Sequence, residues 1–244
     1  MRRVMILSGA GLSAESGIST FRDSDGLWEN YDVMTVCSTQ GWQQDRALVT
    51  DFYNARREAL EDKAPNAMHR ALAALEAKYP NRIIHLTQNV DNLMEKAGST
   101  GVLHLHGTLT DLRCESCQET FHVGYRAQKE DEQCPHCGEY DVRHNVVMFG
   151  ESAPAYRHIY EAVDASDMFI AIGTSGKVID VVPLVQEFSH SILVNPKREE
   201  HVTAFGRFDN YIDDYFEHFL QSPATVAVDE MVELIEEFLD EKQA

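Results

Sequence analysis

The hydrophobic pattern alternates between short continuous apolar runs and longer stretches with helical spacing. Apolar runs that end in glycine or polar turns predict buried strands at 4–7, 83–86, 102–105, 168–172 and 192–194. Amphipathic spacing predicts helices over 40–61, from 65 onward, over 92–97 and over 226–239. Strands that alternate with helices indicate βαβ units. We therefore predict an α/β fold with a doubly wound parallel sheet.

Composition and charge narrow the class of protein. The 244 residues are 43% hydrophobic and 25% charged, which is ordinary for a soluble domain. Forty acidic against 21 basic residues give a net charge of −19, which opposes non-specific attraction to nucleic acid or anionic membranes and favours lysine-rich partners. No run approaches the roughly 20 apolar residues of a membrane span, and the apolar run after Arg2-Arg3 is too short for a signal peptide. We expect a cytoplasmic monomer with no membrane partner and no specific nucleic-acid partner.

A glycine-rich turn follows the first predicted strand. The segment Gly9-Ala10-Gly11-Leu12-Ser13-Ala14 has the pattern G-x-G-x-x-A. Glycines let the backbone approach a pyrophosphate, and the next helix can offer N–H groups to the anion. No acidic residue closes a second strand about 20 positions later, so an ordinary tight turn remains an alternative.

Four of the five cysteines have metal-ligand spacing. The pairs Cys114-x-x-Cys117 and Cys134-x-x-Cys137 are separated by 16 residues. One redox pair is the alternative for either half, but two pairs favour a tetrahedral zinc ion. Four thiolates leave no open position, so the Zn²⁺ would be structural. The fifth, Cys37, is more typical of a small buried residue than of a nucleophile.

The cysteine segment and the 40–61 helix interrupt the strand–helix alternation. We expect them to form a smaller domain, a zinc-ribbon module with a helical insertion, from residues 29–63 and 108–145. Residues 1–28, 64–107 and 146–244 would form the Rossmann-like domain.

Polar side chains end two of the predicted strands. Gln88, Asn89 and Asp91 follow 83–86, where parallel sheets open into a ligand crevice. An N-cap explains Asn89 or Asp91 alone, but not the three together. His104 and His106 share one face of 102–105, and each fits a general base or a structural histidine equally well.

In this order, these features resemble the sirtuin family, and the likeness runs through most of the chain. The matching stretches are Gly9-Ala10-Gly11, Ser16-Gly17-Ile18, Thr20-Phe21-Arg22, Thr87-Gln88-Asn89-Val90-Asp91, His106-Gly107, the two cysteine pairs, Phe149-Gly150-Glu151, Gly173-Thr174-Ser175 and Val194-Asn195.

The resemblance implies an NAD-dependent deacylase of acylated-lysine proteins. In that family the acyl oxygen attacks C1′ of the nicotinamide ribose and expels nicotinamide. A histidine, here His106, acts as base on a ribose hydroxyl, which attacks the acyl carbon. Water then yields free lysine and O-acyl-ADP-ribose. Asn89 would be the second catalytic residue and position the ribose and water.

The resemblance also assigns binding residues. Gln88 would lie along the ribose, Asp91 would hold the carboxamide, and Phe21 would shield the reacting carbon. The other expected dinucleotide contacts are Gly9, Ala10, Gly11, Ser13, Ala14, Arg22, Gly173, Thr174, Ser175, Asn195 and Ala224. A strand over 147–150, with Val147, Phe149 and Gly150, would pair with the substrate backbone.

Tyr53 and Arg56 point to a subclass. They lie three apart on a predicted helix and so share a face, where a guanidinium beside a phenol can bind a carboxylate. Without the family, a packed Tyr53 and a solvated Arg56 would be the simpler interpretation. The pair matches the Y-x-x-R of sirtuins that prefer succinyl-, malonyl- or glutaryl-lysine, and Cys37 replaces the small alanine that lines their acyl pocket.

Two other functions use the same NAD site. One is transfer of ADP-ribose to proteins, although His106 counts against it because simple transfer needs no such base. The other is a non-catalytic NAD sensor.

Overall fold

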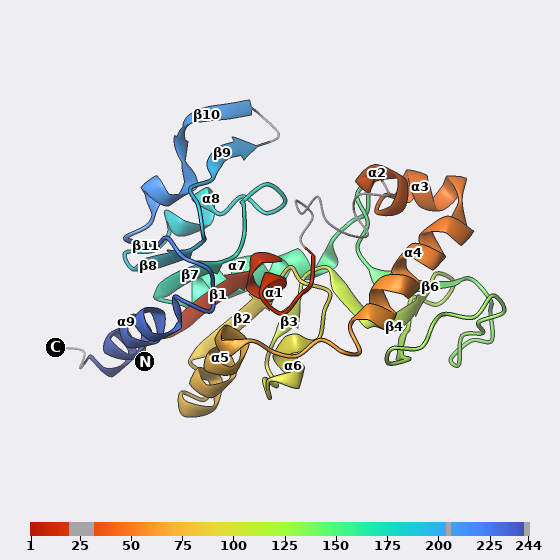
Figure 1. The fold of residues 1–244 in the computed structure, drawn as a ribbon, viewed down its shortest axis with the longest axis horizontal. Helices are drawn as coiled ribbons and strands as arrows, with labels where there is room; N and C mark the ends of the chain where they lie inside the picture. Colours follow the sequence, from red (N-terminus) through yellow and green to blue (C-terminus); the bar gives the residue numbers. More distant parts are fainter. Residues whose placement is uncertain (20–31, 204–205, 242–244) are drawn as a thin grey trace.

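A parallel sheet forms the centre of the computed structural model, which describes residues 1–19, 32–203 and 206–241 (Figure 1). In this part of the chain the sheet has six strands in the order β11-β8-β7-β1-β2-β3, and all neighbours are parallel. The strands are β1 (Val4–Ser8), β2 (Ile83–Thr87), β3 (Leu103–His104), β7 (Met168–Ile172), β8 (Ser191–Val194) and β11 (His218–Leu220). The predicted α/β class and its five strands are confirmed, and β11 is a strand that the pattern did not predict.

Both faces of the sheet are covered by helices, which explains the continuous apolar strands. Val4 and Ile6 of the fully buried β1 pack on the side of α5 (Ala67–Lys78), α6 (Leu93–Lys96) and α9 (Val228–Asp240). Met5 and Leu7 pack on the side of α7 (Arg157–Ala165) and α8 (Val182–Val185). Single turns complete this part of the fold: α1 (Gly11–Ala14), η1 (Pro154–Tyr156) and η2 (Ile212–Tyr215).

A second group of elements lies beside the large sheet (Figure 1). It contains the antiparallel sheet β5-β4-β6, formed by β4 (Gly107–Cys114), β5 (Thr120–His122) and β6 (Val142–Val146). Helices α2 (Val33–Val36), α3 (Thr39–Gln44) and α4 (Arg46–Ala59) accompany it. The helix predicted over 40–61 is therefore two helices. They part at Asp45, whose carboxylate accepts the Leu48 amide at 2.9 Å and so caps the start of α4.

Buried Arg57 joins α4 to the small sheet. Its side chain is fully buried and donates to the backbone carbonyls of Leu109, Asp111 (3.0 Å) and Arg126 (3.2 Å). A guanidinium satisfies several carbonyls at once, so this one side chain fixes the helix against β4.

A β-hairpin of β9 (Glu200–Thr203) and β10 (Gly206–Tyr211) extends from the large sheet (Figure 1). Among the described residues, no helix combines the length and apolar character needed to cross a bilayer.

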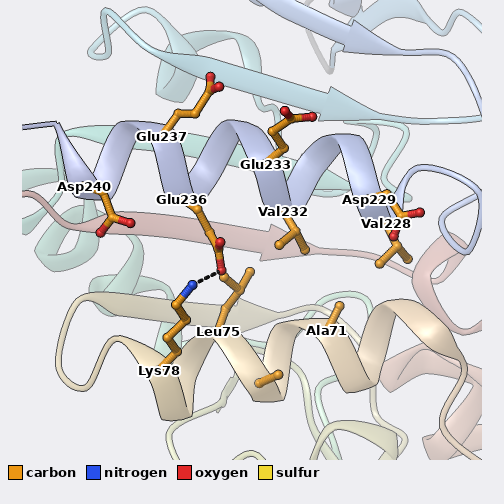
Figure 2. Close-up of a pocket in the computed structure, with 11 residues that line it drawn as sticks. Ala71, Leu75, Lys78, Val228, Asp229, Val232, Glu233, Glu236, Glu237 and Asp240 are labelled. Carbon is orange, nitrogen blue, oxygen red and sulfur yellow. Dashed lines mark hydrogen bonds and ion pairs between the residues drawn. The ribbon is translucent and has the colours of Figure 1, made fainter.

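Helices α5 and α9 enclose a surface groove of about 690 Å³ (Figure 2). Lys78 of α5 reaches across to Glu236 of α9 and forms an ion pair of 2.6 Å. The groove is lined by Ala71, Ala74, Leu75, Lys78, Val228, Asp229, Val232, Glu233, Glu236, Glu237 and Asp240. None of these is a predicted site residue, so the groove is separate from the candidate site.

Candidate active site

The glycine turn after β1 packs directly on a second turn after β7. A Cβ on Gly9 would lie 2.8 Å from the Gly173 carbonyl oxygen, and one on Gly11 would lie 2.6 Å from the Gly173 Cα. Gly173 itself has a φ of +62°, in the left-handed region. Glycine is required here because the two backbones touch at the carboxyl ends of adjacent strands, β1 and β7.

Three amides of the turn have partners within the chain. The Gly11 amide donates to Gly173 O (2.9 Å), the Leu12 amide to Gly9 O (3.0 Å) and the Ser13 amide to Ala10 O (3.1 Å). Helix α1 is a single turn, Gly11–Ala14, and the contact of this turn with a pyrophosphate stays a prediction.

Ser13 joins the turn to the loop after β2. Its hydroxyl donates to the buried Asp91 carboxylate at 2.9 Å and accepts from Asn89 Nδ2 at 3.2 Å. Burial raises the pKa of Asp91, while hydrogen bonds from the Leu93 amide and Ser13 oppose that rise. Residues predicted from two separate motifs, the glycine turn and the 87–91 stretch, therefore meet in one network.

A parallel network links the loops after β2, β7 and β8. Gln88 Nε2 donates to Thr174 Oγ1 at 3.2 Å, and Asn195 Nδ2 donates to the Thr174 carbonyl at 2.7 Å. Thr174 and Asn195 are buried, whereas Gln88 is half-buried. Polar side chains from three strands thus converge at one edge of the sheet, as expected for an open α/β crevice.

His106 lies at this edge, just beyond β3. Its Nδ1 is 2.9 Å from the Gln88 carbonyl oxygen, and its Nε2 is 2.7 Å from the Tyr156 hydroxyl. Burial lowers the pKa of His106, and the Gln88 carbonyl only partly opposes this. The imidazole is therefore neutral near pH 7, with Nδ1 protonated and Nε2 able to accept a proton.

His104, the other candidate base, is tied into the scaffold. Its Nδ1 contacts the Asn89 carbonyl at 2.8 Å and its Nε2 contacts the Glu95 carboxylate at 2.9 Å. Burial lowers its pKa, but the bond and charge of Glu95 outweigh this, and the pKa is raised. A histidine held by a carboxylate at the sheet edge supports the 89–91 loop.

Tyr53, Arg56 and Cys37 come together beside this edge, in the core between α2, α4 and the small sheet. Tyr53 lies beside His144, with ring centroids 5.4 Å apart and the rings tilted by 32°, and its phenol is next to the Cys37 thiol. The half-buried Arg56 lies over the Phe52 ring at 5.6 Å. Burial lowers the pKa of Arg56, and the Asp91 carboxylate is among the charges that oppose this. The guanidinium is therefore not a freely solvated surface group.

Residues 147–150 form no regular strand within this structure, and their pairing with the substrate backbone stays a prediction. Phe149 forms only an isolated bridge with Ser38. Its amide donates to Cys37 O at 2.8 Å and its carbonyl accepts from the Thr39 amide at 3.0 Å, so both its backbone groups are used within the chain. Gly150 turns the backbone with a φ of +90°, which ends any extension. Val147 is tied by its amide to the His106 carbonyl at 3.0 Å.

The four paired cysteines form a compact cluster. Their sulfurs all lie within 4.8 Å of one another, with Cys114–Cys137 at 3.6 Å and Cys117–Cys134 at 3.7 Å. Tetrahedral zinc with bonds of about 2.3 Å places its sulfurs about 3.8 Å apart. The donor set fits one zinc ion and leaves no position for water. Zinc there would be structural.

Comparison with known proteins agrees with this geometry. Residues 9–180 match the model of the Sir2 family. The chain belongs to the Sir2 family. A protein named NAD-dependent protein deacylase from Campylobacter jejuni is 47% identical over 215 residues, covering 88% of this chain and 91% of its own. One of the same name from Helicobacter hepaticus is 36% identical, covering 98% and 99%.

Solved Sir2 structures share the whole architecture. A Sir2 homologue in complex with ADP-ribose has a TM-score of 0.81 and 33% identity, covering 99% of this chain and 95% of the other. A Sir2 homologue–NAD complex has a TM-score of 0.80 and 34% identity, covering 98% and 91%.

The remaining residues that were expected to contact the dinucleotide differ in their placement. Phe21 and Arg22 lie outside the described residues. Ser175 follows the Gly173–Thr174 turn and is half-buried, whereas Ala14 is exposed on the last position of α1. Ala224 is packed in the core with α9.

Two further residues at the site had no motif to mark them. Tyr156 contacts the His106 Nε2 from η1, 50 positions away, and His69 Nε2 lies 3.3 Å from the Ser13 hydroxyl. Only the folded chain brings them to the sheet edge.

Proposed function

We propose that this Sir2-family enzyme uses NAD to remove succinyl, malonyl or glutaryl groups from protein lysines, with deacetylation as a lesser activity. The observation that carries the acyl preference is the partly buried Arg56, which lies beside Tyr53 and Cys37 and within electrostatic reach of the Asp91 carboxylate. The acyl pocket and the proposed NAD site are therefore adjacent.

The pocket favours an acidic acyl group on electrostatic grounds. Burial raises the pKa of both Tyr53 and Cys37, so both are neutral near pH 7 and neither neutralises the positive charge of Arg56. A substrate carboxylate would gain a planar fork of N–H donors from Arg56 and a hydroxyl donor from Tyr53. An acetyl group offers neither charge nor acceptor at that depth. The small Cys37 thiol leaves room for the longer chain.

The proposed chemistry depends on the held orientation of His106. The Gln88 carbonyl keeps the proton on Nδ1, so Nε2 can take a proton from a ribose hydroxyl as it attacks the acyl carbon. NAD would supply the electrophilic ribose carbon and the nicotinamide leaving group. Asn89 and Gln88, both half-buried with amides aimed along the crevice network, would hold the ribose. Asp91 would hold the carboxamide.

The relatives support the NAD requirement. Those at 36–47% identity bear the name NAD-dependent protein deacylase, and similar folds were solved with NAD and with ADP-ribose. A net charge of −19 suits acylated proteins that are rich in lysine. One zinc ion at the four cysteines would stabilise the small sheet that carries His144 and the pocket wall.

The test is a panel of peptides that differ only in the acyl group on one lysine: acetyl, malonyl, succinyl, glutaryl and a long-chain acyl group. Nicotinamide release from NAD is followed for each. The proposal expects the highest kcat/KM for the acidic acyl groups. A higher kcat/KM for acetyl than for succinyl would refute the acyl preference and leave the deacylase assignment intact.

A further inference from the structure

The nitrogen that the proposed base must use is already occupied by a side chain. The Tyr156 hydroxyl lies 2.7 Å from His106 Nε2, and the two rings are 5.7 Å apart at an angle of 46°. Tyr156 ends η1, and its ring packs against the core beneath α7 and α8. The contact therefore comes from an element far from β3 in sequence.

The direction of this hydrogen bond follows from its neighbours. A backbone carbonyl can only accept, so His106 Nδ1 donates to Gln88 O and the neutral ring has its lone pair on Nε2. Burial raises the pKa of Tyr156, so the phenol keeps its proton and its O–H donates a hydrogen bond to His106 Nε2. A ribose hydroxyl would approach the same nitrogen as the same kind of donor.

We propose that Tyr156 is a positioning residue that occupies His106 Nε2 in the substrate-free enzyme and yields it to the ribose hydroxyl when NAD binds. This inference rests on the proposed function for its kinetic part only. The phenol keeps the ring oriented and in the correct tautomer. Because one O–H donor replaces another, the exchange breaks and forms equivalent hydrogen bonds, and His106 needs no rotation.

The neighbouring titratable groups have other partners. His104, at the end of β3 two residues earlier, is bonded to Glu95 and to the Asn89 carbonyl. Asp91, on the facing loop, accepts from Ser13 and from the Leu93 amide. The Tyr156 phenol is therefore the titratable side chain bonded directly to the His106 ring in the described structure.

The first test needs no catalysis. The His106 ring is titrated by NMR in the substrate-free protein, with its signal assigned by its loss in His106→Gln. A donor on Nε2 stabilises the neutral ring, so Tyr156→Phe should raise the His106 pKa by about 0.5 to 1. Tyr160→Phe is the matched control, because Tyr160 lies on α7 and is 70% exposed. An unchanged His106 pKa in Tyr156→Phe would overturn the proposal.

The second test separates the free enzyme from the substrate complex. The acid limb of kcat/KM reports the free enzyme, whereas that of kcat reports the complex. In Tyr156→Phe the acid limb of kcat/KM should move to higher pH. At pH values well below the His106 pKa, kcat/KM should fall by about three- to tenfold, and at pH 8 it should change little. The kcat limb should not move, because the ribose hydroxyl has by then replaced the phenol. Equal movement of both limbs, or of neither, would contradict the exchange.

Failure of the Tyr156 proposal and failure of the proposed function give different results in these tests. If Tyr156→Phe raises the His106 pKa but His106→Ala leaves deacylation intact, the contact stands and the base assignment is wrong. Tyr156→Met, which keeps bulk but has no donor, should repeat the pKa rise and so guards against an effect of the phenylalanine alone.

Discussion

Replacing Arg56 with methionine removes the charge proposed to recognise the acyl carboxylate and keeps an unbranched side chain over Phe52. Arg56 is half-buried, and burial lowers its pKa, so its bonds to a substrate carboxylate would form largely away from bulk water. A hydrogen bond to a charged group in such a setting is worth about 1.5–3 kcal/mol. At about 1.4 kcal/mol per factor of ten, the variant should lose about 10- to 150-fold in kcat/KM for succinyl-lysine.

The deciding quantity is the ratio of the two activities. Deacetylation involves no acyl carboxylate, so Arg56→Met removes no contact to the acetyl group, and kcat/KM for the acetyl peptide should change by less than about threefold. Both rates are measured from nicotinamide release on peptides of one sequence. Arg46→Met is the control, since Arg46 begins the same helix but pairs with Asp141 at 2.8 Å and is 59% exposed. Equal losses on both peptides in Arg56→Met would refute the carboxylate pocket.

Three further predictions concern stability. Arg57→Met leaves one buried and two partly buried carbonyls without their donor and should cost about 3 kcal/mol, seen as a fall in Tm of roughly 6–12 °C by calorimetry; a fall below 2 °C would contradict the anchoring role. Metal analysis should find one zinc per chain, and removal of the zinc by a chelator should lower the Tm. A chain that keeps its Tm without zinc would contradict a structural metal. Burial lowers the pKa of His69 to about 4 and of His85 to about 3, so the unfolded chain binds protons first as pH falls below about 6.5, and stability is lost between that pH and the native pKa values. Each of the two histidines should lower the free energy of unfolding by about 2 kcal/mol at pH 5 relative to pH 7. In urea unfolding, His85→Gln should therefore lose less stability between pH 7 and pH 5 than the wild type does.

The parts of the fold that local patterns determine could be predicted. β1 is a continuous apolar run because helices cover both faces of its sheet, and the paired cysteines meet because each C-x-x-C turn brings two thiols together. The convergence of Ser13, Asn89 and Asp91 follows from parallel strands that end at one edge. The proposed division of the chain into two domains stays a prediction.

Other features depend on contacts between distant parts of the chain. Amphipathic spacing continues through Asp45, so only the capping bond to Leu48 shows where α3 ends and α4 begins. The strand over 147–150 was expected from the family resemblance alone, but within this chain the Phe149 amide donates to the Cys37 carbonyl. Tyr156 lies in an unremarkable Ala-Tyr-Arg stretch, and its role depends on η1 packing opposite His106.

Steady-state nicotinamide release with NAD and a succinyl-lysine peptide tests the central claim most directly. We predict that release requires the acylated peptide and yields lysine peptide and O-succinyl-ADP-ribose in equal amounts by mass spectrometry. It should fall by about a hundredfold or more in His106→Ala, since a general base typically contributes about 10²- to 10⁴-fold. Release that continues without the peptide and leaves ADP-ribose attached to protein would contradict the account and favour ADP-ribosyl transfer.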